Sequence, residues 1–159
     1  MTGLLRRCSI EDKEFVEKVL NDPGVRPYAT DDLYVGYIEA NFLLYDKNTV
    51  VLRFGDYGII VYRRFNFATY DQHFYLLGEF HHNFPYHYVW VQEAIDWMFT
   101  NTNCLKIIGL TTHDFKHGEN IGFTKEGVIT KSHMMKRQLL DLHVYGCCKD
   151  IWEKGKKNG

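Results

Sequence analysis

The sequence predicts a single α/β domain built on one mixed β-sheet. Three strand-like segments follow one another closely at residues 49–54, 57–65 and 70–80, the pattern of an antiparallel meander. A strongly periodic helix at residues 87–101 then precedes a nearly continuous apolar strand at residues 104–111. Because a strand–helix–strand crossover makes its two strands parallel, the sheet should contain both parallel and antiparallel pairs.

Length and composition fit one globular domain. The chain has 159 residues, of which 45% are hydrophobic and 25% charged, an ordinary balance for a folded protein. We expect the domain to occupy residues 1–152. Residues 153–159 combine three lysines with glycine and asparagine, so we expect them to form a frayed tail.

The remaining elements flank this central pattern. Residues 4–10 read as a first strand, and Ser9, followed by two acidic residues, predicts the N-cap of a helix that ends before residue 24. A second helix is expected within residues 31–45. After the crossover, a short polar stretch at 112–120 can hold one or two helical turns. Two final strands are expected at 123–131 and 139–147.

Charge and cysteine usage exclude several classes of protein. The net charge is −1 and the basic residues are scattered, so we expect no nucleic-acid partner. No apolar run approaches the roughly 20 residues that span a bilayer, so we expect no membrane insertion. Without CxxC spacing or a signal peptide, the four cysteines indicate reduced thiols and a cytoplasmic location.

A metal site is not expected. Cys147, Cys148 and His143 are close in sequence, but adjacent residues on a strand point to opposite faces and would converge poorly on one ion. The three histidines at 81, 82 and 87 lack a partnering cysteine or carboxylate at ligand spacing.

The last third of the chain carries the most specific motifs. Gly122-Phe123 is followed by Lys125-Glu126-Gly127-Val128, and later by Asp141, Val144, Tyr145, Asp150 and Trp152. Together these resemble the sixth and seventh strands and the tail of the GCN5-related N-acetyltransferase (GNAT) superfamily, in particular its ribosomal-protein N-acetyltransferases. The order of elements resembles the same fold over almost the whole chain.

The resemblance implies a site for acetyl-CoA. In that superfamily the cosubstrate lies between the fourth and fifth strands, here residues 70–80 and 104–111, and its pyrophosphate meets the N-terminal amides of the long helix. The residues that this alignment makes cofactor contacts are Phe80, His82, Asn83, Phe84, Pro85, Tyr86, His87 and Thr111.

This sequence departs from the superfamily pattern at the phosphate-binding turn. Where the pattern has Arg or Gln, then Gly, then Gly or Ala, this chain aligns His82, Pro85 and His87. Proline removes an amide donor and the histidine adds bulk where glycine allows close approach, so the turn is a poor phosphate cradle. Pro85 remains a good residue for starting the helix.

The resemblance also implies acid–base residues. Glu79 or His81 would take the proton of the amine. Without a catalytic role, Glu79 would be a solvated carboxylate at the end of a strand, and His81 would belong to a surface loop. The tyrosine that protonates the leaving thiolate in many members aligns with Gly118 here, so Tyr145 or Tyr86 would have to replace it.

Two functions follow. The first is an acyl-CoA-dependent N-acetyltransferase acting on an amine-bearing small molecule, protein or peptide. The alternative is a GNAT-like protein without catalysis, resembling divergent phage-encoded members and serving as an interaction or head-assembly protein in the host cytoplasm. Aromatic residues such as Phe65 and Phe67 would then form the contact surface with an assembly partner or a second copy. These aromatics also fit ordinary strand faces.

Overall fold

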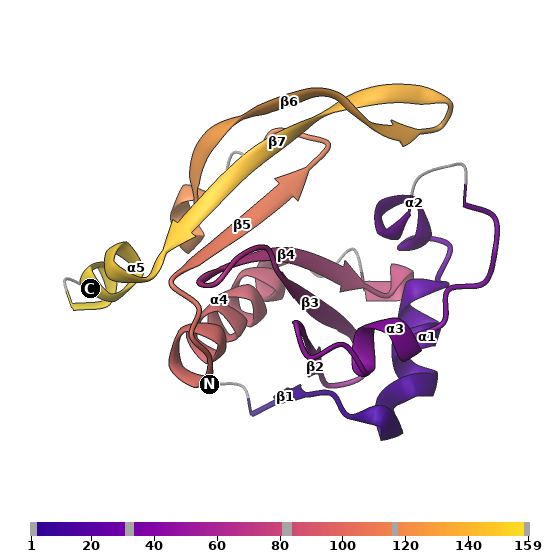
Figure 1. Ribbon diagram of the computed structural model, residues 1–159, viewed down its shortest axis with the longest axis horizontal. Helices are drawn as coiled ribbons and strands as arrows, with labels where there is room; N and C mark the ends of the chain where they lie inside the picture. The colour runs from indigo at the N-terminus through magenta and orange to yellow at the C-terminus, as the bar shows by residue number, and fades with distance from the viewer. Residues whose placement is uncertain (1–2, 31–33, 81–83, 116–117, 158–159) are drawn as a thin grey trace.

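A computed structural model describes residues 3–30, 34–80, 84–115 and 118–157, and shows one seven-stranded sheet in the order β1-β2-β3-β4-β5-β7-β6 (Figure 1). The strands are β1 (Leu5–Arg7), β2 (Thr49–Phe54), β3 (Gly58–Arg64), β4 (Thr69–Leu76), β5 (Lys106–Thr111), β6 (Thr124–Met135) and β7 (Gln138–Cys148). The helices are α1 (Lys13–Leu20), α2 (Arg26–Ala29), α3 (Asn41–Leu44), α4 (Phe84–Asn101) and α5 (Lys149–Lys157). Short 3₁₀ turns are η1 (Ile10–Asp12), η2 (Gly78–Phe80) and η3 (Glu119–Ile121).

The predicted mixed sheet is confirmed. Strands β1 to β4 pair antiparallel in sequence order, as a meander requires. After the crossover through α4, β5 pairs parallel to β4. The C-terminal hairpin then adds β7 and β6 in reverse spatial order, because β7 pairs with both β5 and β6.

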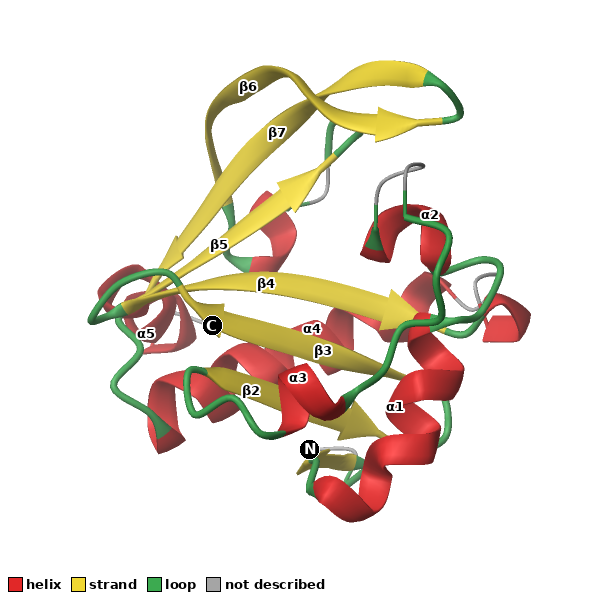
Figure 2. Cartoon of the chain, turned by 45° about the vertical axis from the view of Figure 1, so that its right-hand side comes forward, coloured by secondary structure: helices red, strands yellow, loops and turns green. Residues whose placement is uncertain are grey.

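Helices cover both faces of the meander (Figure 2). Alternate residues of β3 divide between two cores: Ile60 and Tyr62 pack with residues of α4, and Ile59 and Val61 pack with residues of α1 and α3. Successive side chains of a strand point to opposite faces, so a strand covered on both sides must be apolar throughout. This explains the continuous apolar run in β3.

The region before the meander differs from the prediction. Among the described residues 34–45, the expected helix is limited to α3, and the short helix α2 was not anticipated. Side chains in α1 and directly after it form hydrogen bonds with the backbone of the loop at residues 34–40, which precedes α3. Asn21 bonds both the N–H and the carbonyl of Ile38 at 2.9 Å, and Glu17 accepts from the N–H of Ala40 at 3.0 Å. The loop therefore has partners for its polar backbone without forming a helix.

The C-terminal end is ordered further than a frayed tail would be. Helix α5 continues to Lys157, beyond the expected domain boundary at residue 152. Trp152 donates its indole N–H to Asp96 on α4, and Lys156 forms an ion pair with the same carboxylate. Long-range contacts that the local composition does not reveal thus hold this segment against the domain.

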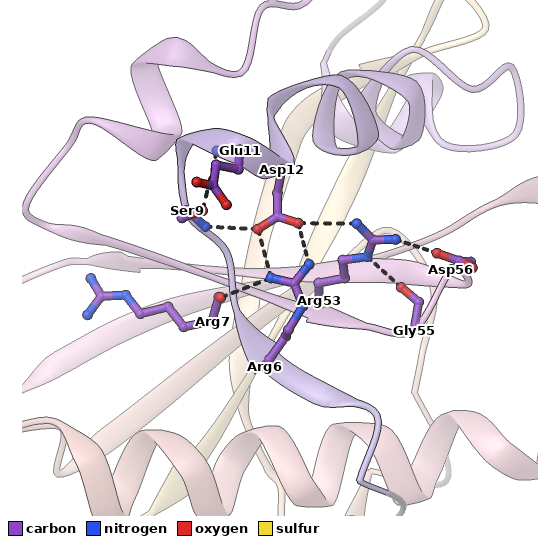
Figure 3. A network of polar contacts seen from close by, with 8 residues as sticks. All are labelled: Arg6, Arg7, Ser9, Glu11, Asp12, Arg53, Gly55 and Asp56. Carbon is purple, nitrogen blue, oxygen red and sulfur yellow. Dashed lines mark hydrogen bonds and ion pairs between the residues drawn. The ribbon is translucent and has the colours of Figure 1, made fainter.

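A network of charges fixes the N-terminal edge of the sheet (Figure 3). Ser9 caps η1 as predicted, and the side chain of Asp12 accepts the backbone N–H of Ser9 at 3.0 Å. The same buried carboxylate accepts from Arg6 at 2.8 Å and from Arg53 at 3.2 Å. The hydrogen bonds from Arg6 hold the pKa of Asp12 well below its ordinary value, despite the burial of the carboxyl group. The network joins β1, η1 and β2.

Candidate active site between β4 and β5

The two parallel strands separate part-way along their length. Along the described strands, pairing between β4 and β5 begins at Thr69 and Lys106 and ends at Gln72 and Gly109. Beyond that point β4 remains paired with β3, and β5 remains paired with β7. The sheet therefore opens into a V between its two halves, which Figure 1 shows from the side.

A cavity of about 380 Å³ lies in this opening. Its wall combines β4, β5 and the loop after it, the second turn of α4, the β6–β7 hairpin and one residue of α2. Its lining residues include Tyr28, His73, Gly109, Thr111, His133 and Tyr145. The position, at the C-terminal ends of two diverging parallel strands, is where α/β proteins usually bind ligands.

The β6–β7 hairpin closes one side of the cavity. Nε2 of His133 on β6 lies 3.3 Å from the carbonyl oxygen of Pro27 in α2, a contact between segments 106 residues apart. Tyr28, next to Pro27, also lines the cavity. Two distant parts of the chain thus meet above the opening, which neither local sequence pattern indicates.

His73 on β4 stands beside a carboxylate. It is the first β4 residue after the last pair with β5, and its Nε2 lies 3.2 Å from Oδ2 of Asp71 and 2.9 Å from Nη2 of Arg63. Its ring stacks on Tyr75 with centroids 6.1 Å apart. Burial opposes ionisation of Asp71, but the hydrogen bonds from His73 and Arg63 outweigh it, and the pKa of Asp71 is lowered.

Tyr145 on β7 is held rigidly at the opposite wall. Its hydroxyl donates to Oδ1 of Asp114 at 2.5 Å and accepts the backbone N–H of Phe115 at 2.8 Å. Lys125 reaches the same Asp114 oxygen at 3.0 Å. Burial, together with the hydrogen bond to Asp114, raises the pKa of Tyr145, so the phenol stays protonated at neutral pH. These bonds fix the loop that follows β5.

The predicted site residues fall into three groups. Tyr145 and Thr111 line the cavity, and the Thr111 hydroxyl donates to the carbonyl of His113 at 3.1 Å. His81, His82 and Asn83 lie outside the described residues. Phe84, Pro85, Tyr86 and His87 form the first turn of α4, which is described by its backbone.

Glu79 and Phe80 do not line the cavity. Strand β4 ends at Leu76, four residues before the predicted end at residue 80, and η2 turns the chain away. Glu79 is exposed in this turn, and Phe80 packs edge-on against Tyr57 with ring centroids 4.8 Å apart. The N–H of Gly78 donates to Asp22 at 3.2 Å, a long-range hydrogen bond that holds the backbone in this turn just after the strand ends.

Three further properties concern the described part of the chain. No group of three or more His, Cys, Asp or Glu residues within it is arranged to hold a metal ion. Cys147 is buried and Cys148 half-buried, as expected for neighbours on a strand. None of the described helices combines the length and apolar character needed to cross a membrane.

Comparison with known proteins identifies the fold. No protein-family model and no curated protein sequence matches the chain. Among solved structures, it is similar to a spermidine N-acetyltransferase from Vibrio cholerae in complex with CoA and spermine, with a TM-score of 0.76, 17% identity, and coverage of 94% of this chain and 96% of that chain. It is also similar to a ribosomal-protein-S5-alanine acetyltransferase from Vibrio fischeri, with a TM-score of 0.69, 16% identity and 93% coverage of each chain. The protein therefore has the fold of the GNAT superfamily, as its C-terminal motifs predicted.

Proposed function

We propose that this protein is an N-acetyltransferase that moves an acetyl group from acetyl-CoA to an amine. The observation that carries the proposal is the cavity in the V between β4 and β5, in a chain whose fold is that of N-acetyltransferases. Its volume of about 380 Å³ lies within the usual range for small-molecule sites. Its wall is mostly aromatic and aliphatic with a few polar groups, which suits a thioester arm.

The first turn of α4 would bind the phosphates. Helix N-termini attract anions through unpaired amides and the helix dipole. Pro85 supplies no N–H, so this turn offers one donor fewer than the superfamily pattern. We place the phosphate contacts on residues 82–87 and the contacts to the thioester end near Thr111.

Tyr145 would supply the proton that the leaving thiolate takes. Tyr145 lines the cavity, and its raised pKa keeps the phenol protonated, which is the state a general acid needs. Its hydrogen is donated to Asp114 in the structure and would turn from that carboxylate to the sulfur. The amine nitrogen attacks the thioester carbon, the C–N bond forms and the C–S bond breaks. Holding both reactants in one cavity would provide much of the rate.

A binding and turnover experiment tests the proposal. A ligand at about 100 times its Kd stabilises a protein by about 2.7 kcal/mol. For a chain of this size, that corresponds to a rise in Tm of roughly 5–10 °C with acetyl-CoA. Release of free CoA thiol, measured with amine acceptors, reports transfer. No change in Tm at millimolar acetyl-CoA would refute the proposal.

A matched pair of variants locates the site. A Cβ at Gly109 meets just the Phe123 ring, at 3.7 Å, so Gly109→Leu should fold while occupying part of the cavity. It should abolish the rise in Tm. Gly127→Leu is the control, because Gly127 is a strand residue away from the cavity wall with open space around its Cβ position. An equal response to acetyl-CoA in both variants would place binding elsewhere.

The acceptor is an amine whose class the assay must decide. The two similar enzymes act, by their names, on a polyamine and on a protein alanine. A panel of spermidine, simple amines and short peptides with free N-termini separates small-molecule from protein acceptors. The alternative role in phage head assembly receives no support from these similar structures.

A further inference from the structure

His73 lines the cavity at the point where β4 and β5 separate. It is the first residue of β4 beyond the last pair with β5, so it stands at the apex of the V. Its side chain lines the cavity and is 21% exposed, enough to reach a ligand while largely shielded from water. The sequence-based expectations did not include it.

Asp71 orients the imidazole. Its Oδ1 accepts the backbone N–H of Arg63 at 3.1 Å, and its Oδ2 accepts from the Arg63 guanidinium at 2.9 Å, so the carboxylate is fixed. Nε2 of His73 lies between an acceptor, Oδ2 of Asp71 at 3.2 Å, and a donor, Nη2 of Arg63 at 2.9 Å. We take the tautomer in which Nε2–H and the Arg63 guanidinium both donate to Asp71, which leaves the lone pair of the ring on Nδ1. A carboxylate that holds the tautomer and stabilises the imidazolium is the arrangement that makes histidine an effective base.

The other titratable groups of the described cavity wall are less suited to this role. Tyr145 donates its hydroxyl hydrogen to Asp114. His133 contacts the carbonyl of Pro27, which is uncharged and stabilises an imidazolium less than a carboxylate does. His113 is exposed and lies beside the Thr111 hydroxyl, and Tyr28 is more than half exposed. Tyr75 and Tyr88 also line the cavity, and burial raises the pKa of both phenols.

We propose that His73, positioned by Asp71, is the catalytic base that deprotonates the acceptor amine. This inference rests on the proposed N-acetyltransferase function. Nδ1 takes one proton from the acceptor ammonium and later releases it to water. The neutral amine attacks the thioester carbon. The second proton that the nitrogen loses on becoming an amide restores the Tyr145 hydroxyl, whose own proton has passed to the thiolate sulfur.

Kinetics of three variants test the role of His73. His73→Gln should lower kcat/KM by roughly 10²- to 10⁴-fold, the usual contribution of a general base. It should leave the rise in Tm with acetyl-CoA unchanged. In the wild type the rate should fall as pH falls and the imidazole becomes protonated, and this limb of the pH profile should disappear in His73→Gln. Asp71→Asn should lower kcat/KM by a smaller factor than His73→Gln does, and it should change the pH at which the rate falls. Asp56→Asn, which replaces an exposed carboxylate outside the cavity wall, is the control and should retain wild-type kinetics.

The outcomes are distinct. An inactive wild type would refute the proposed function itself. An active wild type with a His73→Gln variant within threefold of it, or with the acidic limb retained, would refute the role of His73 alone. Long-range ¹H–¹⁵N spectra of the histidine side chains give a readout that does not need turnover. They should show His73 protonated at Nε2, and protonation at Nδ1 in the neutral form would overturn the proposal.

Discussion

Replacing Asp12 by asparagine should destabilise the protein through one defined network. The residue is 5% exposed, and its carboxylate accepts two hydrogen bonds from Arg6, one from Arg53 and one from the N–H of Ser9. The asparagine side chain would keep the size of the original but bring two amide hydrogens toward two guanidinium groups. The change removes the charge that joins β1, η1 and β2.

The expected loss is about 2–4 kcal/mol. Removing one partner of a buried ion pair costs about 3–5 kcal/mol, and one hydrogen bond to a charged group contributes about 1.5–3 kcal/mol. The lower part of this range applies because the Arg6 side chain is 54% exposed and water compensates for part of its lost partner. For a chain of this size, Tm should fall by roughly 5–15 °C.

Urea unfolding at several pH values measures the effect and its sign. Because the pKa of Asp12 is lowered by folding, its contribution is complete above the unfolded pKa of about 3.9 and is lost as the pH falls through the folded pKa. The free-energy difference between wild type and Asp12→Asn should therefore shrink below about pH 4. Asp56→Asn is the control, since that carboxylate also pairs with Arg53 but its side chain is 86% exposed. A loss below about 0.5 kcal/mol at pH 7, or one that does not change with pH, would refute this reasoning.

Three further predictions concern the C-terminal half. Gly122→Ala should cost about 2–5 kcal/mol in urea unfolding, because φ is +89° and a Cβ would lie 2.6 Å from the Trp152 ring; wild-type stability would contradict this. Tyr145→Phe should lower kcat at least tenfold while acetyl-CoA still raises Tm, so a kcat within twofold of wild type would remove the tyrosine as proton donor. Asp96→Ala should release α5 from α4, since Trp152 and Lys156 both bond that carboxylate. Limited proteolysis should then cut within residues 149–157, and resistance equal to that of wild type would show that other contacts hold the helix.

The sheet could be predicted from the sequence because its signals are local. The period-2 patterns and the Gly55 turn gave the bounds of β2 as residues 49–54, as observed, and the crossover predicted the parallel pair. Of the helix expected within residues 31–45, the described residues form α3 at Asn41–Leu44, and residues 34–40 are not helical. Their backbone bonds are taken by Asn21 and Glu17, which no local propensity reveals.

The cavity lies between the two strands where the sequence predicted a ligand site, but its wall includes residues that the sequence-based prediction did not name. The V between β4 and β5 follows from the crossover, and Thr111 and Tyr145 were expected near it. Tyr28 and His133 were missed because the reach of the β6–β7 hairpin to α2 is a tertiary property. His73 had a readable signal: Asp71 and His73 alternate on one strand face, just where the predicted parallel pair was expected to separate.

The position of β7 bears on how the protein is made. Chains are synthesised from the N-terminus and tend to fold in that order. The half built from β1 to β4 and α4 can assemble early, but β5 joins it through four residue pairs and β6 has β7 as its neighbour in the sheet. The second wall of the cavity therefore forms after residue 148 has been added. A chain interrupted earlier would carry an open edge on β5, where other nascent chains could pair, so the segment that completes the site also protects the unfinished protein from aggregation.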